Sequence, residues 1–117
     1  MIEDKAKELG RLIGQSSEYK AVKKANELLG DDKAAVELLK RMEQLRINAQ
    51  QMIQRGERPT EEMEKELDTL LGQVQQQPVY QRLVSAQENF DKIMSKVNDW
   101  IVEGIEKGAQ SSIITLG

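Results

Sequence analysis

The side chains in this sequence that could do chemistry are mostly carboxylates, and their densest run comprises Glu61, Glu62, Glu64 and Glu66. Helical proteins bind pairs of metal ions through glutamates, but they combine them with a histidine three residues away. The chain contains no histidine and no cysteine, so the commonest acid–base group and all thiol chemistry are missing. We interpret the run as the acidic start of a helix, where carboxylates interact favourably with the helix dipole. The sequence therefore predicts no catalytic, metal-binding or cofactor-binding residues.

Other motifs with binding potential also have simpler interpretations. Asp31–Asp32 lacks the alternating oxygen ligands of a calcium loop, and the glycines occur singly rather than in a phosphate-binding pattern. The lysines and arginines are interrupted by acidic residues and have no aromatic neighbours on which bases could stack. The formal net charge is −3, so we expect no direct binding of nucleic acid.

Length and composition favour one small helical domain. The chain has 117 residues, of which 32% are charged and 3% aromatic. Such a composition is typical of long amphipathic helices. No apolar run is long enough to cross a bilayer, and the N-terminus lacks an apolar stretch of signal-peptide length. We expect a cytoplasmic protein that does not bind membranes.

Apolar residues recur three and four residues apart through most of the chain, and glycines, prolines and capping residues divide this pattern into five segments. The expected helices span about 2–13, 17–29, 32–55, 60–75 and 79–107. The predicted fold class is all-α: a helical hairpin or bundle of three long helices, with two short N-terminal helices packed against it. Residues 1–108 would form a single helical domain. Residues 109–117 would form an extended C-terminal tail, which could either fray or dock on the bundle or a partner.

The last of these helices is the strongest candidate for an interface. It would be about 40 Å long, too long for a compact protein of this mass to enclose. A second copy of the chain is the economical cover for its apolar stripe, so we expect a homodimer. Core packing explains one member of the stripe, Phe90, better than an interface does, whereas Trp100 fits both equally. The candidate interface residues are Phe90, Ile93, Met94, Val97, Trp100, Ile101 and Ile105.

The order of these features resembles the YlbF/YmcA family of small bacterial helical proteins. The likeness covers nearly the whole chain, from residue 2 to about residue 107. It rests on these elements in sequence: Ser17-Glu18-Tyr19, Leu28-Leu29-Gly30-Asp31-Asp32, the turn at Arg55-Gly56, Thr60-Glu61-Glu62, Gln77-Pro78 and Ala86-Gln87-Glu88.

The resemblance implies an all-helical dimer in the bacterial cytoplasm without known catalytic residues. Family members are associated with the control of competence, sporulation and biofilm formation. Some act with a partner protein in a complex that influences ribonuclease Y and messenger RNA turnover. Certain members hold an iron–sulfur cluster through cysteines, and because this chain has no cysteine that property is not expected here.

Three functions are compatible with the sequence. The first is a regulatory or adaptor protein that acts through protein–protein contacts, and the missing chemistry, the long apolar seams and the resemblance favour it. The second is a structural or chaperone-like protein that binds clients through exposed apolar surface. The third, an enzyme or metal protein built on carboxylates, is the least favoured. Partner selectivity separates the first two, and elemental analysis tests the metal version of the third.

Overall fold

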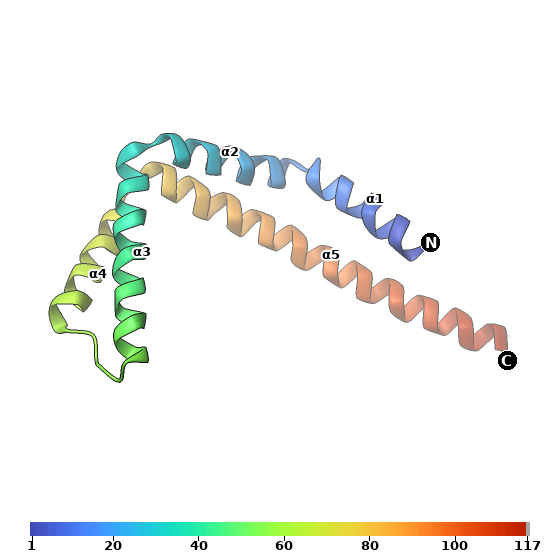
Figure 1. The fold of residues 1–117 in the computed structure, drawn as a ribbon. Coiled ribbons are helices and arrows are strands. Elements are labelled where there is room, and N and C mark those ends of the chain that lie inside the picture. The colour runs from blue at the N-terminus through green and yellow to red at the C-terminus, as the bar shows by residue number, and fades with distance from the viewer. Residues whose placement is uncertain (117) are drawn as a thin grey trace.

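A computed structural model describes the backbone of residues 1–116 and the side chains of residues 1–110. The described backbone contains no β-strand, and the prediction of an all-α fold is confirmed. The first four helices begin and end within two residues of their expected limits. The described backbone forms five helices (Figure 1): α1 (Ile2–Gly14), α2 (Ser17–Asp31), α3 (Lys33–Gln54), α4 (Glu61–Gln75) and α5 (Pro78–Leu116).

Side-chain caps fix the start of three helices. Ser16 Oγ accepts a hydrogen bond from the backbone N–H of Tyr19 at 3.1 Å, at the start of α2. Asp32 Oδ1 accepts the equivalent bond from Ala35 at 3.0 Å, at the start of α3, and Thr60 Oγ1 caps α4 in the same way. Each such cap stabilises a helix by about 1 kcal/mol because it satisfies a backbone donor that the helix itself cannot.

Two connections are abrupt. Asp32 is the only residue between α2 and α3, and its extended backbone (φ −89°, ψ 102°) turns the chain between them. Gln76, which caps the end of α4, and Gln77 separate α4 from α5, and Pro78 occupies the first position of α5. Proline is well suited to this position because its missing N–H would have no helical partner there. The predicted break at Pro78 is therefore confirmed.

Gly56 ends α3 in the left-handed conformation, with φ +80°. The backbone N–H of Glu57 donates to Met52 O at 2.8 Å, and that of Gly56 donates to Ile53 O at 3.0 Å. These two bonds form the paired pattern of a Schellman motif, which satisfies carbonyls at the end of the helix. Glycine suits this position because other L-residues are strained at positive φ.

Replacing Gly56 by Ala should lower the free energy of unfolding by about 1–2 kcal/mol, because a Cβ atom is disfavoured in the left-handed region. The added methyl group meets no atom within 4 Å, so the expected loss is due to backbone strain and not to a steric clash. Urea unfolding followed by circular dichroism measures it. Gly72→Ala is the matched control: Gly72 lies inside α4 without positive φ, and alanine should be neutral or stabilising there. Equal effects of the two substitutions would contradict the assignment.

The helices form two antiparallel pairs instead of one bundle (Figure 1). α2 packs along the first half of α5, and α3 packs against α4, so that the chain has two arms that meet at Asp32 and Pro78. The predicted arrangement of three long helices with two short N-terminal ones packed against them is not confirmed. α4 has 15 residues, as many as α2. α2 packs along α5, and α1 continues beyond the end of α2.

The core is small, and most of its residues are alanine or valine. Val22 and Ala25 of α2 form a buried cluster with Ala86 of α5, and Leu83 and Phe90 pack against that cluster. Among residues 1–110, the other buried residues are Ala35 on α3, Leu70 and Val74 on α4, and Val97 on α5. Small side chains permit close approach of two helices, but they fill too little volume to hold five helices around one centre.

The molecule is consequently elongated. Its Cα radius of gyration is 21.6 Å and its principal extents are 68 × 37 × 20 Å, whereas a compact chain of this length has a radius of about 13 Å. The accessible surface is 9471 Å², compared with about 6,500 Å² for a compact monomer of this mass. Roughly 3,000 Å² of surface is therefore exposed that a compact fold would bury.

The expectation of an extended tail after residue 108 is wrong for the backbone, because α5 continues to Leu116. No proline interrupts this stretch, and Gly108 does not adopt positive φ, so the helical hydrogen-bond pattern can propagate. The expectation that this segment either frays or docks involves the side chains of Ile113, Ile114 and Leu116, which lie outside the described residues. The domain limits at residue 108 stay a prediction.

Candidate functional site

The part of α5 beyond α2 carries an exposed apolar stripe. Every residue of α5 from 98 to 110 is exposed. We call this segment distal α5. Three of the candidate interface residues lie here: the exposed fractions are 58% for Trp100, 46% for Ile101 and 64% for Ile105, and Val102 beside them is also exposed. Since single exposed apolar residues are common but a contiguous group is not, distal α5 has the character of an interface.

The other four candidate residues lie where the chain itself covers them. Phe90 packs against the α2–α5 cluster, and its ring centre is 5.7 Å from that of Tyr19. Val97 is only 7% exposed, and Ile93 and Met94 are half-buried. The seven residues thus divide into an inner group that packs within the chain and an outer group that is available to a partner.

Helix α1 has an apolar face with little to pack against. Ile2 and Leu12 are exposed, Leu9 and Ile13 are half-buried, and no residue of α1 is buried. Ion pairs within the helix, such as Lys7 Nζ to Glu3 Oε1 at 2.8 Å, lie on its exposed surface. Such pairs contribute at most a few tenths of a kcal/mol, so α1 gains little from them.

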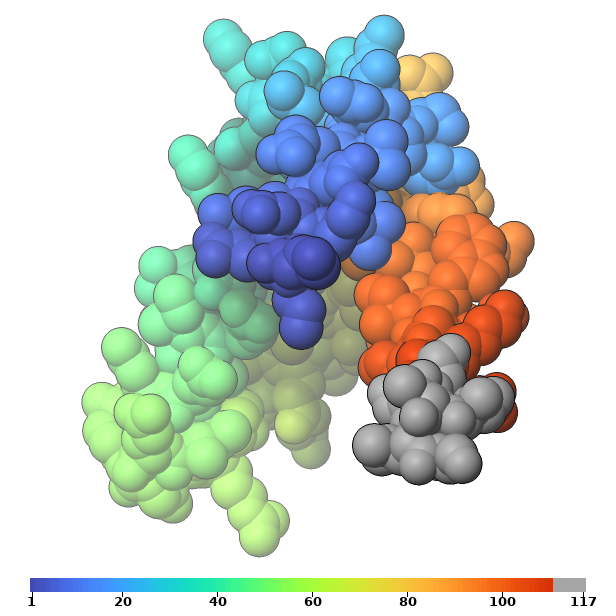
Figure 2. Space-filling view, turned by 90° about the vertical axis from the view of Figure 1, so that its right-hand side faces the viewer, coloured from blue at the N-terminus to red at the C-terminus, as the bar shows by residue number. Residues whose placement is uncertain are grey.

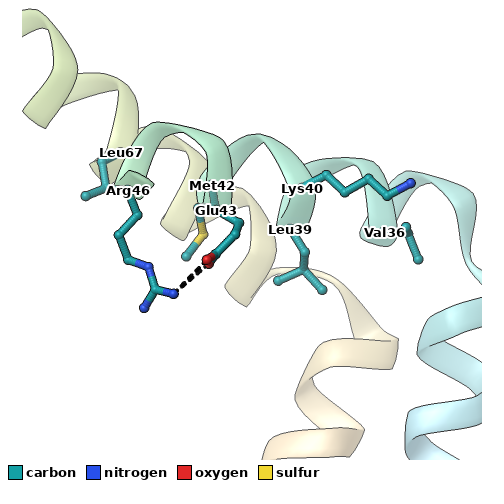
Figure 3. Close-up of a pocket in the computed structure, with 7 residues that line it drawn as sticks. All are labelled: Val36, Leu39, Lys40, Met42, Glu43, Arg46 and Leu67. Carbon is teal, nitrogen blue, oxygen red and sulfur yellow. Dashed lines mark hydrogen bonds and ion pairs between the residues drawn. The ribbon is translucent and has the colours of Figure 1, made fainter. Parts of the chain in front are cut away.

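A third apolar surface lies on the α3–α4 pair. It is a hollow of about 420 Å³ that we call the hairpin groove. Its charged residues include Arg46, whose Nη2 donates to both carboxylate oxygens of Glu43 at 2.8 and 2.7 Å. In Figure 3 the labelled side chains other than Lys40 point toward the side on which the ribbons of α2 and α5 extend, which is the inner side of the angle between the arms, whereas the Lys40 side chain extends along α3. The groove is lined by Val36, Leu39, Lys40, Met42, Glu43, Arg46 and Leu67.

The inner side of the angle is also visible as a recess in the space-filling view. In Figure 2 the α3–α4 pair and the orange end of α5 project as separate lobes, and the surface between them is set back. The spacing of apolar residues did not single out this site. The available signal was that Val36 and Leu39 lie beside the main apolar seam of α3 and widen it.

The acidic run has the environment expected of a helix start. Glu61, Glu62 and Glu64 lie in the first turn of α4 and are exposed, as is Glu66. Among residues 1–110 no three potential metal-ligating side chains come together. Within the described part of the chain, no helix combines the length and apolarity that are needed to cross a bilayer.

The fold and its surfaces define a class: an elongated all-helical protein that presents apolar helix faces on two arms. Comparison with known proteins identifies the family. Residues 2–106 match the family described as "Control of competence regulator ComK, YlbF/YmcA", and the chain belongs to that family. The resemblance seen in the sequence is thereby confirmed, and the family is one of regulators, not of enzymes.

Curated relatives match over almost the same length. A UPF0342 protein of Alkalihalophilus pseudofirmus is 30% identical over 104 residues, which cover 89% of this chain and 88% of that protein. A UPF0342 protein of Halalkalibacterium halodurans is 29% identical over 104 residues, with 89% and 90% covered. One from Leuconostoc citreum is 24% identical over 104 residues, with 89% and 88% covered. All three are bacterial proteins, and their shared name states no activity.

Proposed function

We propose that the protein is a non-catalytic regulatory or adaptor subunit of the bacterial cytoplasm, which forms a homodimer and acts through helix–helix contacts with other proteins. The observation that carries the proposal is the roughly 3,000 Å² of surface beyond that of a compact monomer. Stable homodimers bury about 2,000–5,000 Å² in total, so two such chains have enough surplus surface for a dimer and a further contact.

The distribution of apolar residues supports contacts between helices. Distal α5 presents one tryptophan and three large aliphatic residues to solvent, and burying the exposed part of each would contribute about 1 kcal/mol, since fully burying such a side chain contributes about 1.5–3 kcal/mol. Tryptophan is also enriched among the residues that dominate interface energies. Distal α5 is therefore the element that we place at the dimer interface.

The family supports the regulatory part of the proposal. Its description concerns the control of a competence regulator, and the resemblance implies action within a complex that influences a ribonuclease. Such a role needs surfaces that bind proteins and no catalytic group. The partner surfaces that the dimer leaves open would then be α1 or the outer faces of α3 and α4.

Light scattering coupled to size exclusion should give a mass near twice 13.3 kDa at micromolar concentration. Affinity capture with the tagged dimer should then recover one or two proteins at a fixed ratio to it. A monomeric mass across the concentration range would rule out the dimer. Recovery of many unrelated proteins would instead favour the chaperone-like alternative, for which the exposed apolar faces of α1 and distal α5 would be the client-binding surface.

A further inference from the structure

The hairpin groove is an apolar surface with a defined shape, and no element among the described residues fills it. Leu39 and Met42 of α3 and Leu67 of α4 contribute its apolar lining, and Lys40 and Arg46 carry positive charge at its edges. A neighbouring hollow on α3 shares Val36 and Lys40 with it and adds Lys33 and Glu37. The occupant should therefore be apolar on one side and carry carboxylates beside that side.

We propose that the occupant is distal α5 of a second copy, so that each chain in the dimer places the end of its α5 in the hairpin groove of the other. The proposal rests on the homodimer proposed above and specifies how its two surfaces meet. In the reciprocal pair, Trp100, Ile101 and Ile105 of each copy would contact the groove of its partner.

Charge distinguishes distal α5 from the other exposed apolar helix. Residues 98–110 contain three carboxylates (Asp99, Glu103 and Glu106) and one lysine, Lys107. Helix α1 contains three acidic and three basic side chains and is therefore balanced. In the groove Glu43 is paired with Arg46 at 2.7 Å. In the neighbouring hollow Lys33 and Lys40 outnumber Glu37, so an incoming helix meets a positive charge on balance. Complementary charge favours distal α5 over α1.

The length of the arm fits a reciprocal arrangement. From Pro78 to Ile101, α5 extends about 35 Å at 1.5 Å per residue, so the stripe lies far from the groove of its own chain. Suppose that two copies are related by a twofold axis with their α5 helices antiparallel. The end of each α5 then lies near the start of the other α5, which is also where α3 begins and α4 ends. Such an arrangement is closed because both surfaces of both copies are used.

Cysteine cross-linking tests the contact directly, because the native chain has no cysteine. Differently tagged Leu39→Cys and Ile101→Cys chains are mixed, exchanged and oxidised, and the disulfide-linked heterodimer is quantified on a non-reducing gel. The matched control replaces Leu39→Cys by Asn48→Cys: Asn48 is exposed and lies nine residues further along α3, hence on the opposite side of the helix. The Leu39–Ile101 pair should link at least about tenfold faster than the control pair.

The outcomes separate this inference from the dimer itself. A dimer by light scattering in which the Ile101→Cys chain links only to itself, or links equally fast to the Leu39→Cys and Asn48→Cys chains, would overturn the reciprocal contact and leave the dimer standing. A monomer would overturn both.

A second pair of variants tests the charge argument without touching an apolar residue. Lys40→Glu should raise the dimer dissociation constant about five- to tenfold, since the contact occurs twice per dimer. Arg41→Glu reverses the same charge one residue further along, on the side of α3 away from Leu39, and should change it less than twofold. Equal effects of the two reversals would contradict the placement of distal α5 against Lys40.

Discussion

Replacing Ile101 by Glu should convert the dimer to a folded monomer. Ile101 lies in the exposed stripe of distal α5, so the free chain tolerates a carboxylate there, whereas an apolar interface would have to bury that charge unpaired. Such burial costs several kcal/mol, and we expect the dissociation constant to rise at least about a hundredfold. Light scattering over a concentration series measures the mass, and circular dichroism verifies that the helices remain.

Val84→Glu is the control for this substitution. Val84 is a partly exposed aliphatic residue on the same helix, 17 positions earlier and about 100° away around its axis. Its replacement should alter the dissociation constant by less than about threefold. Persistence of the Ile101→Glu dimer at micromolar concentration would show that distal α5 is not the interface.

Replacing Val97 by Glu should instead destabilise the chain itself. Val97 is 7% exposed and lies on the packed side of α5, four residues before Ile101. A carboxylate there would lose its hydration without gaining a partner, which costs about 3 kcal/mol or more. Urea unfolding should show a correspondingly lower midpoint, even under conditions where both variants are monomeric.

The comparison of the two glutamate variants is more informative than either alone. Ile101→Glu should leave the unfolding midpoint of the monomer close to that of the wild-type chain at a concentration where the dimer has dissociated. Val97→Glu should lower it. If Val97→Glu unfolded like Ile101→Glu, Val97 would belong to the interface and not to the packing of the single chain.

The limits of the first four helices and the start of α5 could be predicted because they depend on local chemistry. Ser16, Asp32 and Thr60 cap helices within three residues of their own positions. Gly56 and Pro78 act through their own backbone geometry. Each of these effects involves residues that are close together in the sequence, so the sequence alone is enough to predict it.

The division of the interface stripe could not be predicted, because it depends on where another helix ends. Val97 and Ile101 lie on the same apolar stripe of α5, and periodicity treats them alike. Only the position and length of α2, 15 residues against 39 in α5, determine which of them is covered. The hairpin groove was missed for the same reason. It is formed by residues of two helices, such as Leu39 and Leu67, and the spacing of apolar residues does not show how two helices are placed relative to each other.

The single residue between α2 and α3 has a consequence for how copies assemble. Asp32 both ends one arm and caps the other, so its extended backbone, together with the connection before Pro78, determines the angle between the arms. In a reciprocal pair this angle determines whether the second contact can form once the first has formed. In the proposed pair, the present angle would let two copies satisfy each other. At a wider angle the same two surfaces would still attract, but each copy would bind a new neighbour, and the product would be an open filament instead of a closed dimer.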